Sequence, residues 1–510
     1  MKQSNVKKQY IVLISILICI FVFEALRAMS VDNCFMYLHF EDILQGNLFR
    51  KTDFLTVHEG LPFSHQKWAM CFLTYIVRNA FGFFGWHIFA VIFNTVNYAI
   101  LAVVITKLNP KNLSANILLL IFPYMLGAFT AFRPHIISSM LVVLEIYYLE
   151  QFSKGELSKK KLWISLFWIS LVTMWFHSTM WPLVVITILP YLFSFDFLCF
   201  KKIKGSVRDI WIGFAILLSA SILQPNGFSQ YKYMWICCSA LSDKLKNSIR
   251  ELNSFNFNET SCLIYLTAVL VGIFVFIVCI RHQKMSCSHL FLAAGYLVLG
   301  FMSIRMIPLS ISVFAIVIAI IMNDAKEESV KLATGGCDLF SSKKIFNRVT
   351  TVGVIIAICN IGFIAYAFNA NYDIKYSKGF ISDYFRDSFK TEDLSKDDMT
   401  NIRLWSVCFN TMASLELYGV TPYMDSRAEL FTGAFGGDDV ITEYNHTLAV
   451  IEENDYAKTL QEFEMLQSKY NFDYYMFPAE LVEACDSIKS LETFADCVEM
   501  TDDVCLYKVR

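Results

Sequence analysis

The sequence carries little charge for its length. Only 17% of its 510 residues are Asp, Glu, Lys or Arg, whereas 56% are apolar and 15% aromatic. The mean hydropathy of +0.48 is too high for an ordinary soluble protein, so the composition indicates an integral membrane protein. The net charge of −2 and the lack of a basic stripe argue against a nucleic-acid partner.

Clustered cysteines are also missing. The 15 cysteines are scattered, with no C-x-x-C and no paired Cys/His spacing, which excludes the common zinc-binding motifs. Cys497 and Cys505 flank a short acidic turn and are the best placed to form a disulfide, provided that this part of the chain lies outside the cytoplasm.

Long apolar runs, each of roughly 17 to 25 residues, recur before residue 370 and are separated by short polar breaks. They predict about eleven membrane spans, at 10–28, 87–106, 115–131, 136–152, 162–178, 180–198, 209–224, 262–280, 288–304, 306–322 and 349–369. Every other break is rich in lysine, as in SKGELSKKK (153–161) and KKIKGSVR (201–208). The positive-inside rule places these breaks in the cytoplasm, and with them the N-terminus, so that the C-terminus lies outside.

Two segments, 62–85 and 228–260, mix aromatic and charged residues and predict helices that lie in the membrane interface. Beyond about residue 370 the chain turns polar and acidic. Short apolar strands (YGVTPYMD, FDYYMFP, DVCLYKV) then alternate with helical stretches (DYAKTLQEFEMLQSKY, PAELVEACDSIKSL), a pattern typical of a small α/β domain. We therefore expect a mainly α, polytopic transmembrane helical bundle at 1–369 with an outer loop at 29–86, followed by an extracytoplasmic α/β domain at 370–510.

Unusual polar residues collect on the side predicted to lie outside. Asp32 opens the first loop, FRPH contributes Arg133 and His135, WFH contributes His177 and SIRMIP contributes Arg305. Ionisable residues at membrane depth are costly and usually face a cavity or a partner. An arginine can hold a phosphate there through fork-like hydrogen bonds, and a carboxylate can take a proton from an attacking hydroxyl.

Each of these residues also has a simpler structural explanation. Asp32 alone can be a solvated boundary residue, the histidines can satisfy a local hydrogen bond, and the arginines can extend to lipid headgroups. Their collection on one side favours the functional interpretation.

The ordered set of motifs resembles the GT-C superfamily of membrane glycosyltransferases, which use polyprenyl-phosphate-linked sugars. The likeness lies in a first outer loop that opens with an acid, in the many further spans and in a soluble C-terminal domain. More narrowly, the chain looks like a group of bacterial multi-span GT-C-like proteins that share TDF…SHQKW, FRPH, WFH, QPNG, SIRMIP and MDSRAELF.

The resemblance implies that Asp32 is the catalytic base and that arginines serve the lipid phosphate. The residues it implies for substrate binding are Asp53, His65, Arg133, His135, His177 and Arg305. Asp425 and Arg427 of MDSRAELF are either a structural pair at the end of a strand or part of an acceptor-binding site. Asp32 is followed by Asn33 and Cys34 rather than by a second acid, so a divalent metal is not supported and no cofactor is expected.

The leading hypothesis is an inverting glycosyltransferase of the bacterial plasma membrane that moves a sugar from an outward-facing polyprenyl phosphate to an envelope glycan, lipid or protein. Two alternatives stay open: a polymerase or ligase that acts on a pyrophosphate-linked glycan, and a non-catalytic transporter or assembly partner. Most spans lack charges and no internal repeat is visible, which favours an enzyme over a transporter.

Overall fold

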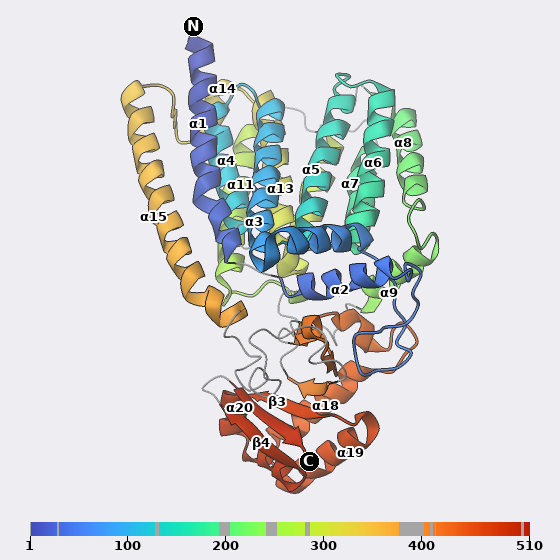
Figure 1. Cartoon of the computed structure of the whole chain (residues 1–510). Helices are drawn as coiled ribbons and strands as arrows, with labels where there is room; N and C mark the ends of the chain where they lie inside the picture. The colour runs from blue at the N-terminus through green and yellow to red at the C-terminus, as the bar shows by residue number, and fades with distance from the viewer. Residues whose placement is uncertain are drawn as a thin grey trace. The chain divides into compact units, whose positions relative to one another are not determined.

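Long apolar helices dominate the computed structural model of the chain (Figure 1). The structure describes residues 2–27, 30–127, 132–192, 205–240, 252–280, 286–376, 402–407, 412–413, 415–500 and 504–510. The chain forms two compact units. The helix-bundle unit comprises Met1–Met29, Phe84–Gly227 and Ile249–Phe368, and the loop–domain unit comprises Ser30–Phe83, Phe228–Ser248 and Asn369–Arg510.

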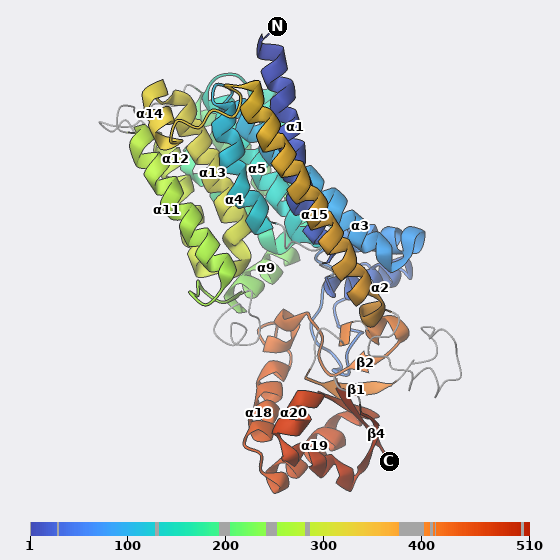
Figure 2. The same cartoon turned by 90° about the vertical axis from the view of Figure 1, so that its left-hand side faces the viewer.

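The helices of the helix-bundle unit lie side by side, as Figures 1 and 2 show. They are α1 (Lys2–Val22), the second part of α3 (Trp68–Leu108), α4 (Leu113–Gly127), α5 (Pro134–Ser153), α6 (Lys159–His177), α7 (Trp181–Leu192), α8 (Val207–Ala220), α11 (Thr260–Ile280), α12 (Cys287–Met302), α13 (Ile307–Asp324), the short α14 (Glu327–Ala333) and α15 (Lys343–Tyr376). Short 3-10 helices η1 (Phe23–Leu26), η2 (Ser178–Met180) and η4 (Ile304–Met306) extend or join them.

Seven stretches of the described chain are long and apolar enough to cross a membrane, so this is an integral multi-pass membrane protein. They are Ser4–Leu26, Trp68–Leu108, Pro134–Ser153, Lys159–Leu192, Thr260–Ile280, Ile304–Asp324 and Lys343–Asn369. Each of the predicted spans contains a helix, but α4 and α12 are shorter apolar helices, and α6 and α7 form one continuous stretch. Helix α8 has 14 residues, which at roughly 1.5 Å per residue is shorter than a bilayer core of about 30 Å.

Helix α13 forms the centre of the bundle. Every residue from Leu309 to Met322 is buried, and the helix contacts α4, α11 and α12. A helix that is apolar all round is stable only where neighbours cover it on every side. Helix α15, by contrast, has only 11% of its most apolar window buried, so it lies at the edge of the bundle (Figure 1).

Of the segment 62–85, predicted to be an interfacial helix, the residues from Trp68 onward fold as the first part of α3, whereas 62–67 precede the helix. Gly82 adopts φ 64° and ψ −161°, which breaks the helix into two parts within Trp68–Leu108. Side-chain-bearing residues rarely adopt this conformation, so glycine is needed at the break. Of the second predicted interfacial segment, Ser229–Ala240 forms α9, and 241–251 lies outside the described residues.

The loop–domain unit contains α2 (Asp32–Leu44), α9 and a mixed five-stranded sheet in the order β2-β1-β3-β5-β4. Its strands are β1 (Arg403–Ser406), β2 (Thr421–Pro422), β3 (Tyr474–Pro478), β4 (Ala495–Met500) and β5 (Val504–Val509). Helices α18 (Val440–Glu452), α19 (Tyr456–Tyr470) and α20 (Ala479–Ala484) and the 3-10 helices η5 (Glu416–Tyr418), η6 (Ala428–Thr432) and η7 (Asp486–Thr493) complete it. Strand β1 pairs in parallel with β2 and β3, whereas β5 runs antiparallel to β3 and β4.

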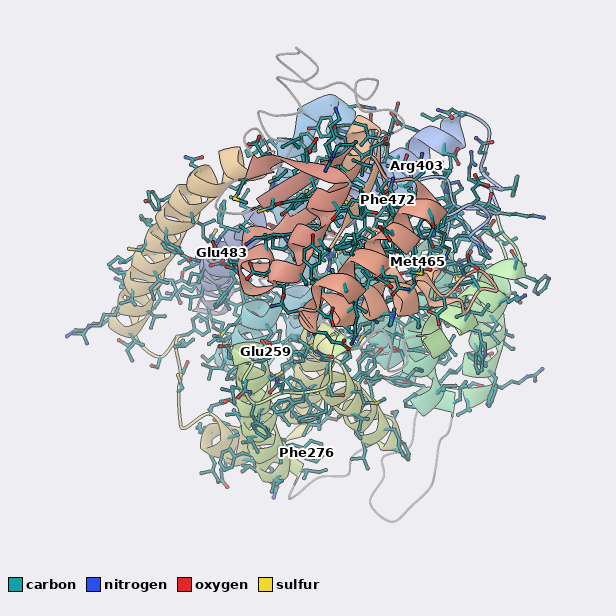
Figure 3. All side chains as sticks on the ribbon, turned by 90° about the horizontal axis from the view of Figure 1, so that it is seen from below. Glu259, Phe276, Arg403, Met465, Phe472 and Glu483 are labelled. Carbon is teal, nitrogen blue, oxygen red and sulfur yellow. The ribbon has the colours of Figure 1, made fainter. Side chains whose placement is uncertain are left out.

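Aromatic side chains fill the core of this domain. Trp405 of β1 is fully buried and packs against Phe477 of β3 and Phe463 of α19, with ring centroids 5.4 Å and 6.2 Å away. Arg403 lies next to Phe472 in Figure 3, and its Nη1 donates to the Tyr470 carbonyl at 2.9 Å. These contacts fix β1 and the end of α19 to each other.

The predicted α/β architecture of this region is confirmed. The three predicted strands coincide with β2, β3 and β5, and DYAKTLQEFEMLQSKY folds as α19. The sequence did not predict strands β1 and β4, because β1 has only four residues and β4, an edge strand, carries two acidic residues and lacks a regular apolar alternation. Cys497 and Cys505 both carry free thiols, so the disulfide considered for them is not formed.

Candidate functional site

Asp32 lies at the start of α2, the first helix of the loop–domain unit. Its carboxylate Oδ1 accepts a hydrogen bond from Ser426 Oγ at 3.2 Å, and the side chain is half-buried. Phe35 and His39 follow on the same face of α2, because positions i, i+3 and i+7 align on a helix. Both contact Arg427, whose guanidinium lies 5.9 Å from the Phe35 ring centroid and whose Nη1 donates to His39 Nε2 at 3.3 Å.

The MDSRAELF motif forms a buried ion pair. Arg427 Nε donates to Asp425 Oδ2 at 2.8 Å, Nη2 donates to the same oxygen, and the Arg427 backbone N–H donates to Asp425 Oδ1 at 2.7 Å. Both side chains are almost completely buried. The sequence left a structural and an acceptor-binding explanation open for this pair, and both stay predictions.

Arg427 also binds Asp53 of the first loop, with Nη1 2.5 Å from Oδ1. Thr56 donates to the other oxygen of Asp53 from its backbone N–H at 3.1 Å and from Oγ1 at 2.8 Å. Burial raises the pKa of Asp53, but the Arg427 charge and these hydrogen bonds outweigh it and hold the pKa below its ordinary value. Asp53 is therefore an ionised carboxylate whose two oxygens are both occupied by protein donors.

His65 belongs to a neighbouring cluster around Asp42. Its Nε2 donates to Asp42 Oδ2 at 3.2 Å, while Arg50 grips the same carboxylate with Nε and Nη2, both at 2.7 Å. Asn47 donates to Asp42 Oδ1 at 2.9 Å. Burial lowers the pKa of His65 although the Asp42 charge opposes this, so the imidazole is neutral at pH 7.

Glu416 lies near Asp425 and Arg427, although the sequence did not single it out. It is buried, and no donor among the described residues reaches either carboxyl oxygen. Burial and the nearby Asp425 charge raise the pKa of Glu416 well above its ordinary value, with Arg427 opposing. A protonated Glu416 carries no charge and can donate a hydrogen bond to Asp425. This explains how a third carboxyl group can be buried beside Arg427, whose single positive charge already faces Asp53 and Asp425.

A separate cavity of about 450 Å³ lies in the helix-bundle unit and collects three of the predicted residues. Arg133 precedes α5, where Pro134 forces the extended backbone (φ −130°, ψ 156°), and His135 lies one residue into the helix. Arg305 comes from η4, between α12 and α13. Tyr98, Met180 and Leu309 are among the other lining residues, so the cavity combines two guanidiniums and an imidazole with aromatic and aliphatic walls.

His177, at the end of α6, lies next to a residue that lines this cavity. Its ring packs edge-on against His135 with centroids 4.4 Å apart, and its Nδ1 lies 3.2 Å from Ser138 Oγ. The side chain is buried and is not among the lining residues.

Within the described part of the chain, no group of three or more His, Cys, Asp or Glu side chains is arranged to hold a metal ion. The structure thus brings the predicted residues into two sets. Asp32, Asp53, His65, Asp425 and Arg427 lie in the loop–domain unit, and Arg133, His135, His177 and Arg305 lie in the helix-bundle unit.

Comparison with solved structures gives a match for nearly the whole chain. A crystal structure of the Archaeoglobus fulgidus oligosaccharyltransferase, tethered to an acceptor peptide, matches with a TM-score of 0.52 and 12% identity, covering 95% of this chain and 72% of that one. The fold resembles that of an oligosaccharyltransferase. The apo form of the same enzyme matches with a TM-score of 0.48 and 12% identity, covering 95% and 73% of the two chains. No protein-family model and no curated protein sequence matches the chain. At this identity the likeness concerns the fold, a multi-span helical bundle with a C-terminal α/β domain.

Several residues of these clusters were not singled out from the sequence. Ser426 lies inside the quoted MDSRAELF motif, and Arg50 lies in the first loop, but no spacing in the sequence indicates their partners. Glu150 of α5 is also buried and accepts from Tyr191 at 2.7 Å and from His289 at 2.8 Å. A glutamate inside an apolar run is visible in the sequence and could have signalled this pair.

Proposed function

We propose that this protein is a membrane glycosyltransferase that transfers a sugar, with inversion, from a polyprenyl-phosphate donor to a cell-envelope glycan, lipid or protein. The observation that carries the proposal is the cavity where Arg133, His135 and Arg305 converge among apolar side chains. A lipid-linked sugar phosphate needs that combination, cations for the phosphate and an apolar wall for the chain. The oligosaccharyltransferase-like fold across 95% of the chain supports the same class of reaction.

The two guanidiniums would bind the donor phosphate. Arginine presents paired N–H groups that match phosphate oxygens, and its charge persists at any physiological pH. The leaving group of the transfer is the polyprenyl phosphate, which gains negative charge as the bond to the sugar breaks. Arg133 and Arg305 would stabilise that charge, and His135, held by His177, would add a hydrogen bond.

Asp32 would act as the base. In this step its carboxylate takes the proton of the acceptor hydroxyl, and the acceptor oxygen attacks the anomeric carbon of the sugar. The bond between that carbon and the phosphate oxygen breaks on the opposite side, and the polyprenyl phosphate leaves. Its half-buried carboxylate and the hydrogen bond from Ser426 support this role.

For Asp53, His65, Asp425 and Arg427 we propose a positioning role in place of direct substrate binding. Asp53, Asp425 and Arg427 bond to one another and to Thr56 and His39, His65 Nε2 donates to Asp42, and all four side chains are buried. They join the first loop to the MDSRAELF segment and so hold α2 in place.

We further propose the topology that the lysine pattern predicts, with a cytoplasmic N-terminus and an α/β domain outside the plasma membrane of a bacterium. On the outer face a lipid-linked donor is the natural sugar source, because nucleotide sugars are cytoplasmic. Cysteine-scanning accessibility tests this in a protein whose native cysteines are replaced by alanine, because Cys497 is itself a free, exposed thiol. In that background a membrane-impermeant thiol reagent should label Ser468→Cys in intact cells and spare Glu156→Cys.

The proposal is tested by sugar transfer in membranes. Synthetic short-chain polyprenyl phosphates, each carrying one radiolabelled hexose, are supplied to membranes that contain wild type, Arg133→Ala, Arg305→Ala or the control Arg208→Ala. Arg208 is an exposed arginine of α8 and does not line the cavity. We expect transfer by wild type and by the control, and a loss of at least about 100-fold in each cavity variant, the magnitude typical of removing one charge-stabilising donor. Sugar transfer at the wild-type rate in both Arg133→Ala and Arg305→Ala would contradict the assignment of these arginines to the donor phosphate.

One observation favours a second candidate, a transporter. Glu145 of α5 is completely buried, and neither carboxyl oxygen has a hydrogen-bond partner among the described residues. Buried carboxyl groups at membrane depth often mark ion or proton pathways. If the protein is the proposed enzyme, Glu145→Gln should leave sugar transfer unchanged. If it is a transporter, the same substitution should lower substrate flux across the membrane in a flux assay.

A further inference from the structure

Ser426 stands between two residues that are locked in place. On one side Asp425 Oδ1 accepts from the Arg427 backbone N–H at 2.7 Å, and on the other Arg427 binds Asp53. Moving the Ser426 backbone would break buried ion pairs and leave charges buried without a partner, which is strongly unfavourable. Its hydroxyl is therefore presented from a rigid support.

That hydroxyl reaches Asp32 at the first turn of α2, with 3.2 Å between Ser426 Oγ and Asp32 Oδ1. The same α2 face meets Arg427 through Phe35 and His39. Helix α2 is thus fixed at three points along one face, and the contact nearest to its start falls on the carboxylate itself.

We propose that Ser426 is a positioning residue for Asp32. This inference rests on the proposed function, in which Asp32 is the base. Ser426 donates to one carboxylate oxygen and thereby fixes the direction in which the carboxylate meets the acceptor hydroxyl. It touches neither donor nor acceptor. The arrangement also explains why the motif reads DSR: the acid and the arginine build the support, and the serine between them acts on Asp32.

Positioning of this kind affects the chemical step more than binding. A reacting group displaced by about 1 Å can lose roughly 100-fold in rate. Removal of the hydroxyl should therefore lower kcat and leave KM for the lipid donor unchanged. A purely structural serine would instead lower the amount of folded protein, and with it the maximal velocity of the membranes, while kcat per folded molecule and KM stay unchanged.

The test compares Ser426→Ala, Ser426→Thr and the control Ser468→Ala. Ser468 is an exposed serine of α19 whose hydroxyl donates to the Met465 carbonyl of the same helix. The probe is the synthetic polyprenyl-phosphate hexose that wild type turns over, with membranes adjusted to equal content of folded protein. We expect Ser426→Ala to lower kcat about 10- to 100-fold at unchanged KM, Ser426→Thr to stay within about threefold of wild type because it keeps the hydroxyl, and Ser468→Ala to match wild type.

The outcomes separate the two proposals. If wild type transfers sugar and Ser426→Ala does so at the same kcat, or if Ser426→Ala changes only KM or melting temperature, the positioning role is wrong and the proposed function stands. If wild type turns over no donor, and removing the protein changes no surface glycan, the proposed function fails and this inference fails with it.

Discussion

Arg427 Nη1 and Asp53 Oδ1 lie 2.5 Å apart, although 374 positions of the chain separate the two residues. Both side chains are almost completely withdrawn from solvent. The pair joins the first loop to the segment between β2 and α18, so two parts of the sequence that look independent fold as one unit.

Replacing Arg427 with alanine should destabilise the loop–domain unit strongly. The substitution leaves Asp53 and Asp425 buried without their cation, a situation that typically costs about 3–5 kcal/mol. Thermal unfolding of the purified protein in detergent should show a clear drop in melting temperature, and Lys458→Ala, which breaks an exposed pair with Glu453, should show none. An unchanged melting temperature in Arg427→Ala would mean that the pair does not hold this unit together.

Mild acid should weaken the same unit through its buried histidines. Burial lowers the pKa of His39, His58 and His65 below the ordinary 6.5. In the unfolded chain they bind protons from about pH 6.5 downward, whereas in the folded chain they stay neutral to lower pH, so stability is complete above pH 6.5 and falls as the pH decreases. Each histidine contributes a slope of about 1.4 kcal/mol per pH unit within that window.

Glu416 acts in the opposite direction. Its raised pKa means that the folded chain keeps a proton which the unfolded chain has lost above pH 4.5, so this group adds stability as the pH falls. Melting temperatures between pH 7.5 and 5 should therefore drop less steeply in His39→Gln and more steeply in Glu416→Gln than in wild type. Parallel curves for all three proteins would refute the account of this cluster.

The sequence predicts the architecture better than it predicts the contacts. Apolar runs and the change of composition near residue 370 follow from burial in lipid or in a core, and a single sequence shows both directly. The helical face shared by Asp32, Phe35 and His39 was also predictable, because it depends only on helical periodicity. What that face meets was not, since the partner Arg427 lies nearly 400 residues away in the sequence.

Grouping of the candidate residues shows the same limit. The predicted membrane topology places Arg133, His135 and Arg305 on the same side, and all three line a single cavity. It places His177 there too, but this side chain packs against His135 and is not among the lining residues. Sidedness determines which end of a helix a residue occupies, whereas side-chain packing decides whether that residue faces a cavity or a neighbour.

A substitution at Gly82 should disturb the bend of α3. Alanine at φ 64° and ψ −161° costs of order 1–3 kcal/mol in backbone strain, and no atom within 4 Å of the added methyl group would clash. The matched control is Gly362→Ala in α15, which also has open space but an ordinary backbone conformation, and which should be neutral or slightly stabilising. Equal melting temperatures for the two variants would show that α3 is not strained at this bend.

The buried pair of Glu150 and His289 should stabilise the bundle. Glu150→Ala leaves the Tyr191 hydroxyl and His289 without their acceptor, at a cost of about 1–3 kcal/mol. Glu150→Gln keeps an acceptor oxygen and should cost less. The exposed Glu156→Ala serves as the reference. If Glu150→Ala and Glu156→Ala have the same melting temperature, the pair of Glu150 and His289 contributes nothing to the stability of the bundle.

The central claim, that this protein adds a sugar to an envelope acceptor with Asp32 as the base, is tested most directly by surface-glycan composition. A strain that lacks the protein is complemented with wild type or with Asp32→Asn at matched membrane abundance. We expect a sugar to disappear on deletion, to return with wild type and to stay absent with Asp32→Asn. An unchanged glycan on deletion would contradict the glycosyltransferase function, and full restoration by Asp32→Asn would contradict the role of Asp32.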